Sequence, residues 1–338
     1  MKEVSGGFEA LCRVFDSLDL RFVEKNLLRC YRPKESVGRP HRNLLGMFKA
    51  ELIKRLQDVE SYRKLHRLLH SDETIRSLCD IEEGEKPYSR PTLARFRQRV
   101  GPERFQRIMT HLIKELDRLG VMDAETLAVD ATFLKAYSRR DPKDSQRGLS
   151  DSDARLRKQG RNTVLGYGVH LAADAASEMP LAAIVEPANV NEKKVAPLLL
   201  RKAATHKRRI KNMAADSQYS SEAVREEVKR LGGELVIPYP KNQMKGKRVL
   251  RVDRKFRTHG PARLKRLYRR RSAVERTISR LKIHYGLNQL RTRGLRNAMI
   301  HVFLCLIAML VTALASIILG HADMMRSPVR LFKLTGGM

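Results

Sequence analysis

Residues 126–130 (TLAVD) begin the stretch that decides the fold, and two further apolar runs follow at 164–173 (VLGYGVHLAA) and 181–185 (LAAIV). Short apolar runs bounded by Gly, Asp and Pro are typical of buried β-strands. Two more such runs lie at 210–216 (IKNMAAD) and 234–238, and helical patterns separate these later runs. Three strands followed by strand–helix alternation predict an α/β fold with a mixed sheet flanked by helices.

The segments between these strands also carry signals. Asn189-Val-Asn-Glu192 has the shape of a capping box and predicts a helix that runs to about residue 205. A second helix is predicted from Ser221 to about residue 231. Residues 139–163 are polar and charged, and we expect a mobile loop there.

The chain before this α/β region has a helical pattern. Phe8, Leu11, Phe15, Leu18 and Phe22 recur at spacings of three and four, which predicts one helix face. Further on, Gly101-Pro102 separates a short basic helix from an amphipathic one. We therefore divide the chain into an all-helical N-terminal domain at 1–122, an α/β domain at 123–320 and a C-terminal tail at 321–338.

The charge balance points to a polyanionic partner. The chain has 338 residues with 68 Lys+Arg against 37 Asp+Glu, a formal net charge of +31. The density is highest in residues 241–296, where Asp253 and Glu275 are the only acids. So dense a cluster repels itself unless a polyanion neutralises it, so we expect contact with nucleic acid rather than with an anionic small molecule alone.

One long apolar segment leaves an alternative open. Residues 298–319 carry no charged side chain, and their length would span a bilayer. Because His301, Thr312 and Ser316 interrupt it and no second span occurs, we predict a buried helix and no membrane. The four cysteines form no C-x-x-C pair and the N-terminus has no apolar leader, so we predict a cytoplasmic protein.

The basic segment contains a regular constellation. In a continuous helix Tyr268, Arg271, Glu275 and Lys282 lie within a stripe about 60° wide. An adjacent apolar stripe, suited to packing on a core, comprises Leu267, Val274, Ile278 and Leu281. A second basic edge, for which we predict contact with DNA phosphates, comprises Arg269, Arg276 and Arg280.

The spacing Y-x2-R-x3-E-x6-K resembles the signature of the IS4/IS5-type DDE transposases of prokaryotic insertion sequences. Upstream, AVDATFLKAYS is similar to the strand that bears the family's first Asp, here Asp130, and AADSQYSS is similar to the second, here Asp216. The resemblance covers roughly residues 85–320 and implies an RNase H-like fold. Relatives often have Gly or Ala where this chain has Gln218, which we expect to alter the local turn.

The resemblance implies a specific chemistry. Asp130, Asp216 and Glu275 would be the catalytic acids and would hold two Mg²⁺ (or Mn²⁺) ions per site, because phosphodiester cleavage by two metals needs hard oxygen ligands. Arg271 and Lys282 would hold phosphate, and Tyr268 would hydrogen-bond it or stack on a base. The implied function is to bind terminal inverted repeats as a homodimer, cleave the strand and transfer it to target DNA.

Each of these three acids also fits a simpler structural role. Asp130 and Asp216 can each cap a turn, and Glu275 can pair with Arg271 one helical turn earlier. The chain could then be a DNA-binding protein without catalysis. A further alternative keeps the three acids as metal ligands: a metal-dependent nuclease that does not join ends. No phosphate-binding G-x-x-x-x-G-K-[ST] occurs, so no nucleotide cofactor is expected.

Overall fold

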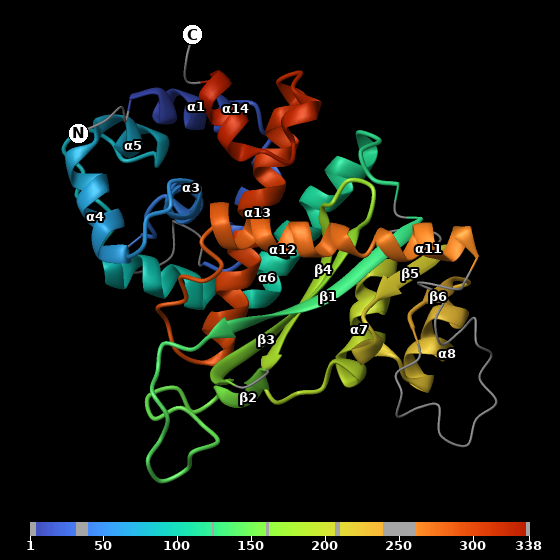
Figure 1. Ribbon diagram of the computed structural model, residues 1–338. Coiled ribbons are helices and arrows are strands. Elements are labelled where there is room, and N and C mark those ends of the chain that lie inside the picture. The colour runs from blue at the N-terminus through green and yellow to red at the C-terminus, as the bar shows by residue number, and fades with distance from the viewer. Residues whose placement is uncertain are drawn as a thin grey trace. The chain divides into compact units, whose positions relative to one another are not determined.

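The structure is a computed structural model that describes residues 5–31, 40–123, 125–159, 162–206, 210–238 and 261–335 (Figure 1). The described chain divides into two compact units. The first comprises Met1–Glu115, Leu281–Arg291 and Met299–Met338, and the second Leu116–Arg280 and Thr292–Ala298. Because the first unit includes C-terminal segments, the linear division at 122 and 320 remains a prediction.

The second unit contains a mixed sheet. Its strands are β1 (Thr126–Lys135), β2 (Arg155–Gln159), β3 (Asn162–Asp174), β4 (Pro180–Pro187), β5 (Asn212–Ala215) and β6 (Glu234–Val236). The strand order is β2-β3-β1-β5-β6, and β4 also pairs with β3. The pairs β1–β3 and β3–β4 are antiparallel, whereas β1–β5 and β5–β6 are parallel. The path β4-β3-β1-β5-β6, with both antiparallel and parallel pairs, confirms the predicted mixed sheet.

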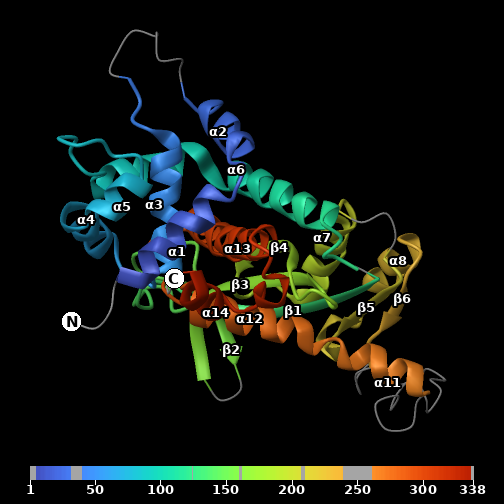
Figure 2. The same ribbon diagram turned by 90° about the horizontal axis from the view of Figure 1, so that it is seen from above.

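Helices cover both faces of this sheet. Figure 2 shows α7 (Glu192–Ala204) and α8 (Glu222–Arg230) on one side of the strands, and α11 (Ala262–Arg269) with the start of α12 (Ser272–His284) on the other. The N-cap of helix α7 is Asn191, whose side chain accepts a hydrogen bond from the Lys193 N–H, so the N-cap predicted at Asn189 is wrong by two residues. The helix predicted from Ser221 is present as α8, and Ser221 is its N-cap.

The predicted loop at 139–163 is wrong in its second half. Residues 155–159 form β2, which pairs with the beginning of β3. The remaining turn is ordered by its acids: Asp141 accepts a hydrogen bond from Arg147 at 3.1 Å, and Asp151 accepts one from the Tyr167 hydroxyl at 2.6 Å. The polar composition predicted a loop because the pairing of this segment with the beginning of β3 cannot be inferred from local composition.

The first unit is helical, as predicted. It contains most or all of α1 (Ser5–Asp16), α2 (Arg21–Leu28), α3 (Leu44–Leu56), α4 (Tyr62–Ser71), α5 (Glu73–Leu78), α6 (Arg90–Arg118), α13 (Leu295–Ile318) and α14 (Pro328–Thr335). The continuous helix face expected through Phe22 is wrong, because α1 ends at Asp16 and Asp19 accepts from the Arg21 N–H where α2 begins. The predicted break in α6 is confirmed at Gly101, where φ is 73°.

Helix α13 contains the long apolar segment. Within the described residues it is the one helix long and apolar enough to cross a membrane, and 89% of its most apolar window is buried. Its polar side chains bond within the protein: Thr312 donates to the Ala308 carbonyl, and Ser316 donates to the Ala313 carbonyl. Burial with internal hydrogen bonds is the pattern of a core helix.

Candidate functional site

Two of the predicted acids lie on neighbouring strands in the second unit, Asp130 in the middle of β1 and Asp216 directly after β5. Strands β1 and β5 pair in parallel, and their last paired residues are Val129 and Ala215. Asp130 and Asp216 follow these residues directly, so the register places the two residues side by side. The sequence pattern ended the first strand at Asp130, and this end is wrong by five residues because β1 continues to Lys135.

The Asp130 carboxyl group lies in a partly buried, negatively charged environment. Its Oδ1 accepts a hydrogen bond from the Ala131 N–H at 2.9 Å. Burial raises the pKa of Asp130, and the negative charges of Glu275 and Asp216 act in the same direction. Asp130 therefore interacts electrostatically with each of the other two predicted acids, and the positive charge of Arg271 opposes their effect.

Arg271 lies against two of these acids. Its Nη2 is 2.6 Å from Glu275 Oε1, and its Nη1 is 3.9 Å from Asp130 Oδ2. The pair with Glu275 is the i, i+4 contact that the sequence left open as an alternative. Asp216 also forms a local contact, because it accepts from the N–H and hydroxyl of Ser217 and caps the 3-10 turn Ser217–Tyr219, which includes Gln218.

The helix that bears Glu275 is interrupted, contrary to the prediction of one continuous helix. Helix α11 ends at Arg269 and α12 begins at Ser272. The Arg271 N–H bonds the Tyr268 carbonyl, and the Val274 N–H bonds the Arg271 carbonyl, so the chain tightens to i→i−3 bonds at the junction. The apolar side nevertheless packs as expected, with Val274 and Leu281 buried.

A cationic pocket opens beside this junction. It has a volume of about 410 Å³ and is lined by Lys265, Tyr268, Arg269, Arg271 and Ser272. The Tyr268 ring is 8% exposed and packs against Val236, while the Arg271 guanidinium lies 5.7 Å from the ring centre. Three cations around one cavity favour an anionic ligand such as phosphate.

The other predicted basic residues have different surroundings. Arg276 and Arg280 both pair with Glu178 in the β3–β4 turn, at 2.7 and 2.6 Å. Glu178 was missed by the sequence reasoning, because nothing in its local pattern indicates a partner about a hundred residues away. Lys282 lies in the last part of α12, which belongs to the other compact unit, so its relation to the acids remains a prediction.

A buried polar group lies in the 3-10 turn that follows Asp216. The Tyr219 side chain is 1% exposed, and among the described residues its hydroxyl has no hydrogen-bond partner. Burial raises the pKa of Tyr219 far above its usual value, and the charge of Asp130 contributes. The charge of Glu192 also raises the pKa of Tyr219, and Arg157, which forms an ion pair with Glu192, opposes this effect.

The donor set suits a hard divalent cation in its chemistry, since all three predicted ligands are carboxylates. Among the residues that the structure describes, no group of three His, Cys, Asp or Glu side chains is arranged to hold a metal ion. Between Asp130 and Glu275 the positive charge is instead supplied by Arg271. Binding of a divalent cation by both acids would therefore compete with this arginine.

Comparisons with known proteins identify two transposase families. A family model described as "Transposase DDE domain" matches residues 122–311, and one described as "Transposase domain (DUF772)" matches residues 7–99. No curated protein matches the chain. A cryo-EM structure of the piggyBac transposase synaptic complex with hairpin DNA is similar at a TM-score of 0.42 and 10% identity, over 98% of this chain and 80% of that one.

Proposed function

The chain belongs to the transposase DDE domain family, and from this premise we propose that it cleaves DNA at the terminal inverted repeats of its element and joins the freed end to target DNA. In the proposed reaction, water attacks a phosphodiester and the P–O3′ bond breaks, which leaves a 3′-OH. That hydroxyl then attacks a target phosphodiester and displaces its 3′ oxygen. The finer assignment to the IS4/IS5 type belongs to this proposal.

The observation that carries the proposal is the β1–β5 register, which makes Asp130 and Asp216 neighbours, together with the contacts of Arg271 with Asp130 and Glu275. The parallel register of β1 and β5 supports the pairing of the two aspartates, and the effect of Glu275 on the pKa of Asp130 supports its approach from α12. Bound by such carboxylates, two Mg²⁺ or Mn²⁺ ions supply an activated water and stabilise the leaving oxygen. Since Arg271 pairs with Glu275, we propose that this pair opens when cations and DNA bind.

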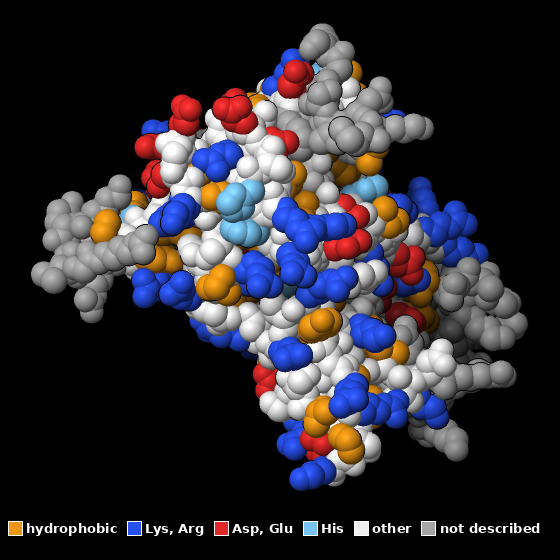
Figure 3. Space-filling model, turned by 90° about the vertical axis from the view of Figure 1, so that its left-hand side faces the viewer, with side chains coloured by type: hydrophobic (Ala, Val, Ile, Leu, Met, Phe, Trp, Pro, Cys, Tyr) orange, Lys and Arg blue, Asp and Glu red, His pale blue; other side chains and the backbone are white. Residues whose placement is uncertain are grey.

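Charge and cavity support DNA as the partner. Lys and Arg side chains are spread over much of the face drawn in Figure 3. The pocket lined by Lys265, Arg269 and Arg271 lies next to Glu275 in the chain, so a phosphate held there would lie near the acids. Residues 241–260 of the basic segment lie outside the described residues. We propose that Lys282 contributes a further phosphate contact.

The assembly and location are also proposals. Pairing two DNA ends calls for at least two copies of the site, so we propose a homodimer in the end complex. The helical region at 1–122, which includes the second transposase-domain match, is proposed to bind DNA, to dimerise, or both. The four cysteines are free thiols, which supports the proposed cytoplasmic location. We propose neither a membrane nor a nucleotide cofactor as a partner.

The test is cleavage of a plasmid that carries the element's inverted repeats, with and without Mg²⁺ or Mn²⁺. Asp130→Asn, Asp216→Asn and Glu275→Gln retain the side-chain shape and remove the charge. We expect each to lower cleavage by at least about a thousandfold while end binding stays within a few-fold, because the cations lose a ligand. Glu222→Gln, at an exposed position in the first turn of α8, is the control and should cleave normally.

Strand transfer is tested separately with a pre-cut end that carries a 3′-OH. Transfer of this end to a target plasmid by the wild type supports a transposase, whereas cleavage without transfer would indicate a nuclease. A DNA-binding protein without catalysis is the second candidate, because Arg271 pairs with Glu275. Full cleavage by Glu275→Gln would refute the proposed site.

A further inference from the structure

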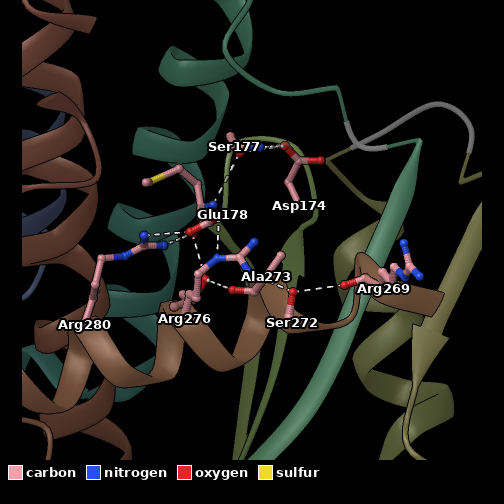
Figure 4. A network of polar contacts seen from close by, with 10 residues as sticks. Asp174, Ser177, Glu178, Arg269, Ser272, Ala273, Arg276 and Arg280 are labelled. Atoms are coloured by element: carbon pink, nitrogen blue, oxygen red, sulfur yellow. Dashed lines mark hydrogen bonds and ion pairs between the residues drawn. The ribbon is translucent and has the colours of Figure 1, made fainter. Parts of the chain in front are cut away.

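Glu178 connects the β3–β4 turn to α12. Its side chain is 7% exposed, and its two carboxylate oxygens accept from Arg276 Nε at 2.7 Å and from Arg280 Nη1 at 2.6 Å (Figure 4). Its backbone carbonyl accepts from the Thr277 hydroxyl at 2.8 Å and from Arg280 Nη2 at 3.1 Å. One residue of the turn therefore binds three residues of one helix.

The turn holds Glu178 in an unusual conformation. Its φ is +62°, in the left-handed region that non-glycine residues rarely adopt. The Asp174 carboxylate accepts from the N–H and hydroxyl of Ser177 at 2.8 and 2.6 Å, and the Glu178 N–H bonds the Asp174 carbonyl at 2.8 Å. A strained residue persists only where its surroundings determine it, here through these bonds and the contacts to α12.

These contacts act on the helical turn that carries Glu275. Arg276 and Thr277 follow Glu275 directly, and successive helical residues point about 100° apart. Holding Arg276 and Thr277 at the β3–β4 turn therefore fixes the rotation of α12 and the direction of Glu275. The Thr277 side chain is fully buried, so the helix has little freedom to turn here.

The net electrostatics favour a permanent contact. Burial works against ionisation of Glu178, but hydrogen bonds from Arg280 and Arg276 hold the pKa of Glu178 below its usual value. Charge-assisted hydrogen bonds of this kind are among the strongest in proteins, and removing one partner leaves the other charge uncompensated. Arg280, with a 15% exposed side chain, is committed to this contact rather than to solvent.

We propose that Glu178 is a positioning residue for the DNA reaction: it fixes α12 so that Glu275 faces the cation site, without itself touching cation or DNA. This inference rests on the proposed function. If Glu178 has this role, its loss should lower the affinity for the divalent cation and the kcat of DNA cleavage. The affinity for DNA ends should stay largely unchanged.

The test compares Glu178→Gln with a matched control, Glu227→Gln, in the full-length protein. Glu227 is also a buried carboxylate paired with two arginines, Arg230 and Arg201, but it joins α8 to α7. For Glu178→Gln we expect kcat for cleavage to fall tenfold to a hundredfold, about the cost of an ångström of misplacement. The Mn²⁺ affinity without DNA, measured by electron paramagnetic resonance, should fall several-fold. Glu227→Gln should stay within twofold of the wild type in both.

A second measurement separates positioning from general stability. If Glu178 acts through Arg280, then Arg280→Gln added to Glu178→Gln should cause little further loss, because the two changes remove one contact. Should Glu178→Gln be unfolded by circular dichroism, Arg280→Lys replaces it: the charge remains, the planar fork is lost, and an intermediate fall in kcat is expected.

The outcomes distinguish the two proposals. A wild type that does not cleave DNA refutes the proposed function, and Mn²⁺ binding then still tests the positioning. Equal Mn²⁺ affinity and equal kcat in Glu178→Gln and Glu227→Gln would overturn the role of Glu178. A selective loss of end binding in Glu178→Gln would overturn it as well, since that result would place the residue at the DNA surface.

Discussion

The Arg271 guanidinium lies 2.6 Å from the Glu275 carboxylate, four residues further along the chain. The same guanidinium also reaches Asp130 at 3.9 Å. Attraction to these acids holds the pKa of Arg271 above its usual value, although burial alone would lower it. Arg271, which we expect to hold phosphate, thus neutralises Glu275 and Asp130, which we expect to hold metal. Experiments can separate the effect of Arg271 on DNA binding from its effect on metal binding.

Replacing Arg271 by Gln should therefore strengthen cation binding and weaken DNA binding. Loss of a positive charge a few ångströms from two carboxylates lowers the competition for a divalent ion. We expect the Mn²⁺ affinity without DNA to rise about threefold to tenfold. End complexes should weaken. Calorimetric Mn²⁺ titration checks the first effect, and Arg263→Gln, whose partner Glu234 lies in the same compact unit, is the control. Weaker Mn²⁺ binding by Arg271→Gln would contradict the competition.

His170 should make the protein sensitive to acid. It is 1% exposed, and burial lowers the pKa of His170 to about 4 from 6.5, although the charge of Glu192 opposes the shift. A depressed pKa contributes stability above pH 6.5, and that stability is lost as the pH falls toward 4. We expect a loss of about 3 kcal/mol from this residue across the window. His170→Leu should remove it.

The measurement for His170 is the free energy of unfolding in urea at pH 7, 6, 5 and 4. The wild-type and His170→Leu curves share every other titrating group, so their difference isolates this imidazole. Two curves that run parallel from pH 7 to 4 would show that His170 is already solvated or partnered in the folded protein.

The positions of three strands along the chain were predictable, because they depend on local signals. Apolar runs bounded by Gly, Asp and Pro located β1, β3 and β4, although β1 continues five residues beyond Asp130. Strand β2 was missed, because its sequence, RLRKQ, has almost no apolar residue. It forms a strand by pairing with the beginning of β3, a tertiary effect that composition does not carry.

The contacts of the predicted site residues could be anticipated only in part. Helical spacing placed Arg271 one turn before Glu275, and the pair is present. The same spacing assigned Arg276 and Arg280 to DNA, whereas the structure pairs both with Glu178. Helical periodicity reports which residues share a face. It does not report which distant turn packs on that face, so it could not predict the contacts of Glu178.

The helical unit should depend strongly on Glu51. This carboxylate is fully buried and accepts from Arg97 at 2.8 Å, from Arg55 at 3.1 Å and from the Tyr62 hydroxyl at 2.8 Å. Removing one partner of a buried charge network leaves the others uncompensated, so Glu51→Ala should lower the free energy of unfolding by about 3–5 kcal/mol.

Urea unfolding measures this loss of stability, with Glu60→Ala as a control. Glu60 pairs with Lys64 at the surface and should cost less than about 1 kcal/mol. Equal effects would contradict a buried network.

Arg269 and Arg280 should differ in their contribution to DNA binding. Arg269 is exposed and lines the cationic pocket, whereas Arg280 is directed to Glu178. Each phosphate contact adds about 0.9 to the slope of log K against log salt concentration. Arg269→Ala should therefore lower this slope by about one and weaken end binding at low salt. Arg280→Ala should leave the slope unchanged, although the rate at which this variant cleaves DNA should fall.

Fluorescence anisotropy of a labelled end duplex, measured at roughly 50 to 200 mM salt, gives both slopes. A decrease of the slope by about one for Arg280→Ala would show that this arginine leaves Glu178 to contact DNA. An unchanged slope for Arg269→Ala would show that the cationic pocket does not contact DNA phosphates.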